Sequence, residues 1–241
     1  METIKSFHKP SVLLLDVYET LLDMADLERK VNNLMDSKRG YVLWFELCMQ
    51  YCFVYNCISR FEPFLKIAKA TMQMAAKTLG ATASEAVIDE ALYMLGHLPI
   101  KDDVPKALSN LMDKNFRIAA LTNAPEHIVR ERMERTGFIS YFETVLCAEH
   151  IKKYKPCIEI YQWAADTLQV EPKDILMITA HGWDITGAAN AGMQTAYVRQ
   201  STQMLYPLAP KPDMVCNNLD DLCSQLSSDK NADRNMTTVS S

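Results

Sequence analysis

Polar side chains of the kinds that enzymes use as nucleophiles, acids and bases follow closely on short apolar runs of this sequence. They are two carboxylates, two hydroxyls, an amide, an ammonium and an imidazole, in chain order Asp16, Thr122, Asn123, Lys155, Thr179, His181 and Asp184. Each alone has a structural explanation, such as a helix cap for either aspartate or a solvated loop for the lysine. Because these residues follow successive apolar runs of the sequence, their occurrence together favours one shared site.

The apolar runs predict the strands of a buried parallel sheet. Short continuous apolar runs are typical of strands covered on both faces, and here they occupy 11–15, 116–121, 144–147, 175–179, 195–198 and 214–216. Helical patterns separate most of them, at 104–114, 126–136, 158–168 and 185–191. This alternation predicts an α/β fold with a Rossmann-like parallel sheet. Ligands bind outside the carboxyl ends of such strands, where the polar side chains stand.

A helical insert interrupts the alternation after the first strand. Between Leu22 and His97 no run predicts a strand, and helical patterns occupy 27–35, 42–54, 64–79 and 84–95. Thr82 and Glu85 have the spacing of a capping box at the start of the last helix. We therefore expect the chain to divide into a core domain, a helical cap domain and a disordered polar tail. The expected limits are 1–21 and 98–226 for the core, 22–97 for the cap and 227–241 for the tail.

The composition argues against several functional classes. The chain of 241 residues carries a net charge of −5, which provides no basic surface for nucleic acid. It has no apolar run long enough to span a membrane and no apolar leader before the first strand. Its seven cysteines include no CxxC pair, as expected for reduced thiols, so we predict a cytoplasmic protein.

Four motifs together resemble those of the haloacid dehalogenase superfamily, from residue 11 to about residue 226. They are LLLDVYETLLD with Asp16, LTNA with Thr122, YKP with Lys155 and TAHGWD with Asp184. The helical insert after the first motif corresponds to the cap domain of that superfamily. The resemblance implies a hydrolase with the superfamily fold and with Asp16 as its nucleophile.

Two positions distinguish the phosphatases of this superfamily from its dehalogenases. The phosphatases carry an acid two residues after the nucleophile, whereas this chain has Tyr18, a phenol with an ordinary pKa near 10. They also hold Mg²⁺ with acidic residues of the fourth motif, where only Asp184 is acidic here. The pattern instead resembles the type II branch, the L-2-haloacid dehalogenases, which implies an enzyme that uses neither metal nor cofactor.

That branch hydrolyses short (S)-2-haloalkanoic acids to (R)-2-hydroxyalkanoic acids. The resemblance implies that Asp16 attacks C2, expels halide and forms an ester, which water then cleaves. Lys155 would keep Asp16 ionised, and Asp184 would orient Lys155. The side chains that would bind, orient or enclose the substrate are Tyr18, Thr20, Thr122, Asn123, Tyr161, Thr179 and Trp183.

Two residues depart from the family pattern. Many members have glycine where this chain has Glu19, and asparagine where it has His181. Because imidazole titrates near neutral pH, we hypothesise that His181 activates the hydrolytic water and that Glu19 orients it and stabilises its cation. The alternative is that both are polar residues that only fill loops.

The halide-binding arginine that family members carry in the cap has no clear counterpart in this insert. The cations that are candidates to replace it are Lys38, Arg39 and Arg60. The aromatic residues of the predicted helix 42–54 that are candidates to line the site, or else to fill the core, are Trp44, Phe45 and Tyr51.

Two further functions stay open: a Mg²⁺-dependent phosphatase of the same superfamily, and a non-catalytic binding protein with the same fold. The expected partners are a small-molecule 2-haloacid substrate and, as in many family members, a second copy of the chain in a homodimer.

Overall fold

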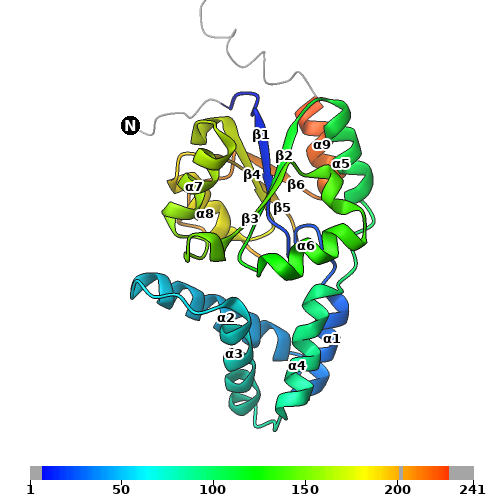
Figure 1. Ribbon diagram of the computed structural model, residues 1–241, viewed down its shortest axis with the longest axis vertical. Coiled ribbons are helices and arrows are strands. Elements are labelled where there is room, and N and C mark those ends of the chain that lie inside the picture. Colours follow the sequence, from blue (N-terminus) through cyan, green and yellow to red (C-terminus); the bar gives the residue numbers. More distant parts are fainter. Residues whose placement is uncertain (1–6, 201–202, 228–241) are drawn as a thin grey trace, which may run out of the picture.

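A six-stranded sheet forms the centre of the computed structural model, which describes residues 7–200 and 203–227 (Figure 1). Its strands are β1 (Val12–Leu15), β2 (Arg117–Thr122), β3 (Thr144–Cys147), β4 (Ile175–Thr179), β5 (Gln194–Val198) and β6 (Met214–Cys216). Every pairing is parallel, in the order β3-β2-β1-β4-β5-β6. The predicted Rossmann-like α/β fold is confirmed.

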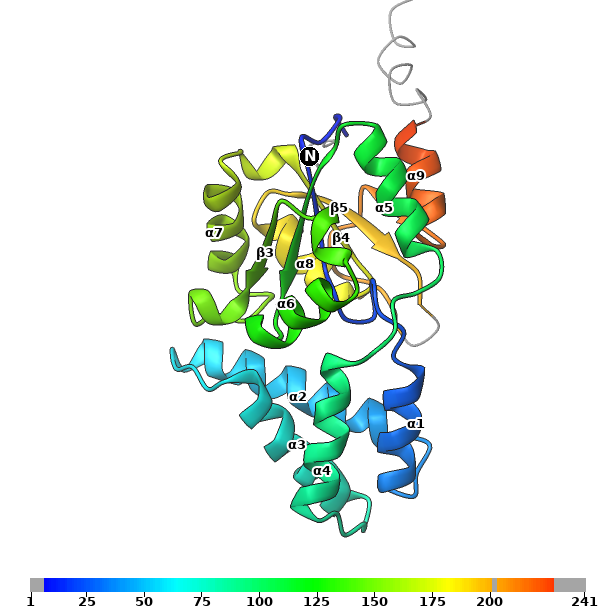
Figure 2. The ribbon, with the colours of Figure 1, turned by 45° about the vertical axis from the view of Figure 1, so that its right-hand side comes forward.

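Helices cover both faces of this sheet. They are α5 (Val104–Asp113), α6 (Glu126–Arg135), α7 (Ile158–Leu168), α8 (Gly182–Asn190) and α9 (Leu219–Ser227). Helices α7 and α8 lie on one face, and α5, α6 and α9 lie on the other (Figures 1 and 2). All residues of β1, β4 and β5 are therefore buried, which explains why these strands read as continuous apolar runs.

Four helices form the insert between β1 and α5, and they lie against the end of the sheet where its strands finish (Figure 2). They are α1 (Ala25–Leu34), α2 (Gly40–Cys57), α3 (Phe64–Thr78) and α4 (Glu85–Tyr93). The two chain segments that connect the insert to the core meet in an antiparallel bridge between Leu22 and Ile100. The helical cap is thus confirmed, while the proposed domain limits at 22 and 97 stay a prediction.

Three local features differ from the sequence-based expectations. The capping box predicted from Thr82 is wrong, because α4 begins at Glu85 and its cap is the Ser84 hydroxyl, which accepts a hydrogen bond from Val87 N at 3.4 Å. Helix α9 was not predicted, and its last residue, Ser227, is the first residue of the predicted tail. The rest of that tail, 228–241, lies outside the described residues.

None of the helices within 7–200 and 203–227 combines the length and the apolar character needed to cross a membrane.

Candidate active site

The carboxyl ends of the central strands bring the predicted polar residues together. Asp16 extends β1, and its backbone N–H donates to the Ile178 carbonyl of β4 at 2.9 Å. Thr122 ends β2 and Thr179 ends β4, directly before the turn that leads into α8. Neighbouring parallel strands finish at the same edge, so residues more than a hundred positions apart in the chain become neighbours.

Asp16 is an ionised, hydrogen-bonded carboxylate. Its Oδ1 accepts a 2.7 Å hydrogen bond from Lys155 Nζ, and its Oδ2 accepts one of 2.8 Å from Thr20 Oγ1. Burial on its own raises the pKa of Asp16. The charges and hydrogen bonds of Lys155 and His181 outweigh burial and hold this pKa well below its ordinary value. The carboxylate is therefore negative at any physiological pH, as a nucleophile requires.

Lys155 joins the two aspartates of the site. Its ammonium donates to Asp16 Oδ1 and Asp184 Oδ2, each at 2.7 Å, and to the Leu121 carbonyl at 3.1 Å. The lysine is 1% exposed, and burial on its own lowers its pKa. The two carboxylates have the larger, opposite effect, so the pKa of Lys155 lies above its ordinary value. The ammonium is thus charged and has all three of its N–H groups occupied.

Tyr161 holds Asp184 in place through a hydrogen bond. Its hydroxyl donates to Asp184 Oδ1 at 2.6 Å, so both Asp184 oxygens already accept a hydrogen bond. A Cβ at Gly187 of α8 would lie 2.7 Å from the Tyr161 hydroxyl oxygen. Only glycine allows this close approach of tyrosine to helix.

His181 stands between two carboxylates. Its Nδ1 lies 3.1 Å from Asp16 Oδ2, and its Nε2 lies 3.1 Å from Glu19 Oε2, in an ion pair that is not aligned as a hydrogen bond. Burial lowers the pKa of His181, but the two carboxylates more than compensate and raise it to about 9. The rings of Phe45 and Trp183 stack on the imidazole with centroids 5.7 and 4.9 Å away, a contact that also favours a cation.

Glu19 is held from three sides besides His181. Its Oε1 accepts from the Tyr41 hydroxyl at 2.9 Å, its Oε2 accepts from Gln203 Nε2 at 2.7 Å, and its backbone carbonyl accepts from Lys101 Nζ. Burial raises the pKa of Glu19, yet the contacts with His181, Tyr41 and Gln203 leave it below its ordinary value. The carboxylate next to the imidazole is therefore charged.

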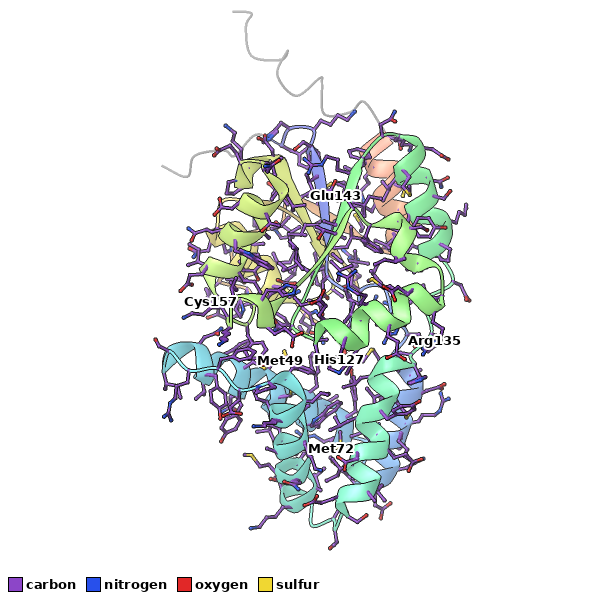
Figure 3. The ribbon with its side chains drawn as sticks, in the orientation of Figure 1. Met49, Met72, His127, Arg135, Glu143 and Cys157 are labelled. Atoms are coloured by element: carbon purple, nitrogen blue, oxygen red, sulfur yellow. The ribbon has the colours of Figure 1, made fainter. Side chains whose placement is uncertain are left out.

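A cavity of about 40 Å³ opens above these groups. Its polar floor consists of Asp16, Thr122, Asn123, Lys155 and His181. Its walls are mostly apolar and include Tyr18, Trp44, Phe45 and Trp183 together with five residues that the sequence did not single out, Met24, Cys48, Met49, Phe64 and Leu95. Figure 3 shows Met49 at the junction of cap and core.

One face of α2 supplies much of the cap side of this cavity. Tyr41, Trp44, Phe45 and Cys48 follow one another at helical spacing and all line it. That spacing was visible in the sequence, but core packing produces the same pattern, so only the structure distinguishes the two. Tyr51 does not line the cavity.

Three residues predicted to bind or orient the substrate have side chains whose polar atoms bond to other residues of the site. Thr20 donates to Asp16 and accepts from Ala180 N at 3.0 Å, and Thr179 accepts from His181 N at 3.1 Å. Neither Thr20, Thr179 nor Tyr161 lines the cavity. Their polar atoms hold the catalytic candidates in place, and their contact with substrate stays a prediction.

No cation of the cap lines the cavity, because Lys38, Arg39 and Arg60 are all exposed. None of the three predicted candidates therefore replaces the cap arginine at the cavity wall. Asn123, predicted to face the halogen, does line the cavity, while its amide also holds the Lys155 backbone through bonds of 2.8 and 3.3 Å.

The site does not fit a metal ion. Asp16 and Asp184 face each other across the Lys155 ammonium, and both oxygens of Asp184 are engaged. Within the part of the chain that the structure describes, no group of three or more His, Cys, Asp or Glu side chains is arranged to hold a metal.

Comparisons with known proteins agree with this fold. A family model described as haloacid dehalogenase-like hydrolase matches residues 10–192. The (S)-2-haloacid dehalogenase 4A of Burkholderia cepacia is 24% identical over 210 residues, which are 86% of this chain and 90% of that protein. The N-acylneuraminate-9-phosphatase of Mus musculus is 26% identical over 229 residues, which are 88% of this chain and 92% of that protein.

A solved structure of L-2-haloacid dehalogenase from Xanthobacter autotrophicus, with chloropropionic acid covalently bound, shares the fold. It aligns with a TM-score of 0.80 at 19% identity, over 90% of this chain and 98% of that one.

Proposed function

Because the chain belongs to the haloacid dehalogenase-like hydrolases, we propose that it hydrolyses short (S)-2-haloalkanoic acids to (R)-2-hydroxyalkanoic acids through an ester on Asp16. The observation that carries the proposal is the ionised Asp16 carboxylate at the floor of a small apolar cavity, paired with Lys155. Dehalogenases and a phosphatase both occur among its relatives, so the substrate class rests on the chemistry of the site.

In the first step, a carboxylate oxygen of Asp16 forms a bond to C2 as the carbon–halogen bond breaks and the halide leaves with its electron pair. Halide is a stable anion, so this leaving group needs no proton. Asp16 loses its negative charge in the ester, while Lys155 and Asp184 stay paired.

This loss of charge has a consequence for His181. In the free enzyme the imidazole is protonated, since its pKa of about 9 depends on Asp16 as well as on Glu19. A protonated imidazole cannot act as a base. Esterification of Asp16 removes one of the two charges that stabilise the cation, so the pKa of His181 falls and its proton passes to solvent.

The neutral imidazole then activates the hydrolytic water. His181 takes a proton from water, and the hydroxide adds to the ester carbonyl carbon of Asp16. The bond between this carbon and the substrate oxygen then breaks, and the remaining hydroxyl proton passes to that oxygen, so that the 2-hydroxy acid leaves. The Asp16 carboxylate and the His181 cation are both restored. One proton and one halide are released per turnover, which balances the reaction of water with the haloacid.

Tyr18 argues against phosphate transfer. Burial raises its pKa to about 12, and its hydroxyl donates to the Leu95 carbonyl at 2.9 Å. A phenol so placed is a poor acid for an alkoxide leaving group. The fourth motif also has Asp184 as its only acidic residue, so few carboxylates are present to bind a magnesium ion.

A halide-release screen tests the proposal. Both enantiomers of 2-chloropropionate, chloroacetate and bromoacetate would be tested with and without a chelator, beside a phosphomonoester, using the wild-type protein and Asp16→Asn. We expect halide release from the (S) enantiomer and the haloacetates, insensitive to chelator and abolished in Asp16→Asn. Chelator-sensitive phosphate release with no halide release would establish the phosphatase, and inactivity on all of them would favour the binding protein.

We also propose that the protein forms a homodimer in the cytoplasm, as its resemblance to the dehalogenases suggests. Sedimentation velocity that finds only a monomer at micromolar concentration would contradict the dimer.

A further inference from the structure

Helix α2, which covers the reaction cavity, is tied to the core at both of its ends. Tyr41, in its first turn, donates to Glu19 Oε1 at 2.9 Å. Near its other end, the side-chain amide of Asn56 donates to the Tyr154 carbonyl at 2.7 Å and accepts from the Tyr154 N–H at 3.0 Å. A substrate that reaches Asp16 without breaking these contacts must pass beside α2.

A cleft of about 500 Å³ lies between the cap helices α3 and α4 and the core helix α6. Leu65 of α3 and Leu92 of α4 line it from the cap, and Ile128 of α6 lines it from the core. Figure 3 shows His127, which also lines the cleft, on the side of α6 that faces the cap. Like the reaction cavity, the cleft is therefore formed by cap and core together.

The cleft and the reaction cavity adjoin each other. At the start of α3, Phe64 lines the reaction cavity and the next residue, Leu65, lines the cleft. After α4, Leu95 lines the reaction cavity and the next residue, Gly96, lines the cleft. Because consecutive residues on two elements line the two spaces, the partition between these spaces is about one residue thick.

A second space also adjoins the reaction cavity, on the side of Glu19. It has a volume of about 220 Å³ and shares Met24 and Tyr41 with the reaction cavity. Its charged lining residues are Glu19, Asp23, Glu28 and Lys101, and those of the cleft are Lys66, Lys69, Asp89 and Glu131. Three carboxylates against one ammonium repel an anion, whereas the charges of the cleft balance, so the cleft is the more favourable approach for a haloacid anion.

We propose that the cleft between α3, α4 and α6 is the entrance through which the 2-haloacid reaches Asp16, with the side chains of Phe64 and Leu95 turning aside as it passes. Rotation of two side chains leaves the contacts at both ends of α2 intact. The identity of the substrate rests on the proposed function, but the position of the entrance does not, since any small molecule of this kind would take the same route.

Cys48 provides a test that needs no catalysis, because its thiol lines the reaction cavity and the residue is only 1% exposed. Iodoacetate, itself a short 2-haloacid, would be added to protein carrying Asp16→Asn, so that the reagent is not hydrolysed. Tandem mass spectrometry would then measure the rate at which Cys48 is carboxymethylated. The exposed Cys57 of the same helix is the internal standard.

Two variants narrow the cleft from different sides. A Cβ at Gly96 would lie 3.6 Å from Ile128 Cγ2, an ordinary contact, so Gly96→Phe places its ring toward the cleft, and Leu65→Trp adds bulk from α3. We expect each to slow the carboxymethylation of Cys48, relative to Cys57, by about 10-fold. Ala25→Phe, which adds the same bulk to the space beside Glu19, is the matched control and should leave the rate unchanged.

Three results would overturn the proposal: slower labelling in Ala25→Phe but not in the cleft variants, the same rate in all three variants, or no labelling of Cys48 at all. Halide release gives a second measurement. In Gly96→Phe, kcat/KM for (S)-2-chloropropionate should fall by a similar factor with a smaller change in kcat, because kcat/KM includes the passage of substrate into the site. A protein that releases no halide would refute the proposed function, while the labelling rates of Cys48 would still locate the entrance.

Discussion

Glu19 has a backbone conformation that normally favours glycine. Its φ of 60° lies in the left-handed region, which costs a residue with a Cβ on the order of 1 kcal/mol. The resemblance to the dehalogenases implies glycine at this position, which makes the glutamate here a departure from the family pattern. The structure adds a physical reason for a glutamate: the same backbone aims its carboxylate at His181, Tyr41 and Gln203. These contacts offset the strain.

The charge dependence of His181 gives a prediction that needs no substrate. Asp16→Asn has no charge at position 16 and so resembles the ester. We expect the pKa of His181, about 9 in the wild-type protein, to fall by more than one unit in Asp16→Asn, because one of its two carboxylate partners is gone. NMR titration of the imidazole measures this, and an unchanged pKa would refute the coupling of the two residues.

Removing the imidazole should separate the two chemical steps. In His181→Asn the attack of Asp16 on C2 needs no base, whereas hydrolysis of the ester loses its base, so we expect turnover to drop by about 100-fold or more. Rapid quench and mass spectrometry should show the ester on the Asp16 peptide. The exposed His127→Asn on α6 is a matched control that should turn over normally. Normal turnover of His181→Asn, with no ester trapped, would mean that Glu19 and His181 only fill loops.

The elements differ in how well the sequence predicts them. The strands at 144–147, 175–179 and 214–216 were predicted to the residue, because each is a short, mostly apolar run. Only 175–179 is buried throughout, since Thr144 is half-buried and Val215 is exposed. Helix α8 was predicted to begin three residues too late, because Gly182 to Asp184 do not continue an apolar stripe. The start at Gly182 matters for the site, since it puts Asp184 in the first helical turn, where it meets Lys155.

The roles of Thr20, Thr179 and Tyr161 show a different limit of sequence reasoning. A motif predicts that a hydroxyl is near the site, but not whether it faces the cavity or the residue behind it. That choice depends on partners such as Ala180 N and Asp184, which only the packed elements place.

At the scale of the elements, Gly187 tests the support of Asp184. In Gly187→Ala the new Cβ meets the Tyr161 hydroxyl of α7 and Pro156 of the loop before α7. We expect α8 and Tyr161 to move apart, with a loss of stability of about 1–3 kcal/mol and a fall in kcat larger than the change in KM. Gly192→Ala is unsuitable as a control because of its positive φ, whereas Ala191→Ser is a mild change on the same helix end. Unchanged activity of Gly187→Ala would show that the close contact is dispensable.

The whole molecule closes the site by laying the cap across the sheet edge. Neither domain alone forms the cavity, since its floor comes from strand ends and much of its wall comes from α2. The sequence could predict that a helical insert was present. It could not predict the cavity of about 40 Å³ between the insert and the core, because the volume of this cavity depends on how the two domains pack.

That volume gives a prediction about substrate size. Met49 of α2 lines the cavity, and Met49→Ala should enlarge it. We expect the ratio of kcat/KM for 2-chlorobutyrate over 2-chloropropionate to rise by roughly 10-fold, about the effect of one methylene in an apolar pocket. Met74→Ala, at an exposed position of α3, is the control that should leave this ratio unchanged. A ratio that does not respond to Met49→Ala would mean that another wall limits the substrate.

The most direct measurement is the path of oxygen in a single turnover. Enzyme in excess over (S)-2-chloropropionate would react in ¹⁸O water. Mass spectrometry would then measure the ¹⁸O content of the digested protein and of the product. An ester intermediate predicts one ¹⁸O atom in the peptide that contains Asp16 and none in the lactate, since water attacks the carboxyl carbon. Label in the lactate with an unlabelled Asp16 peptide would contradict the account, because water would then have attacked the substrate carbon itself.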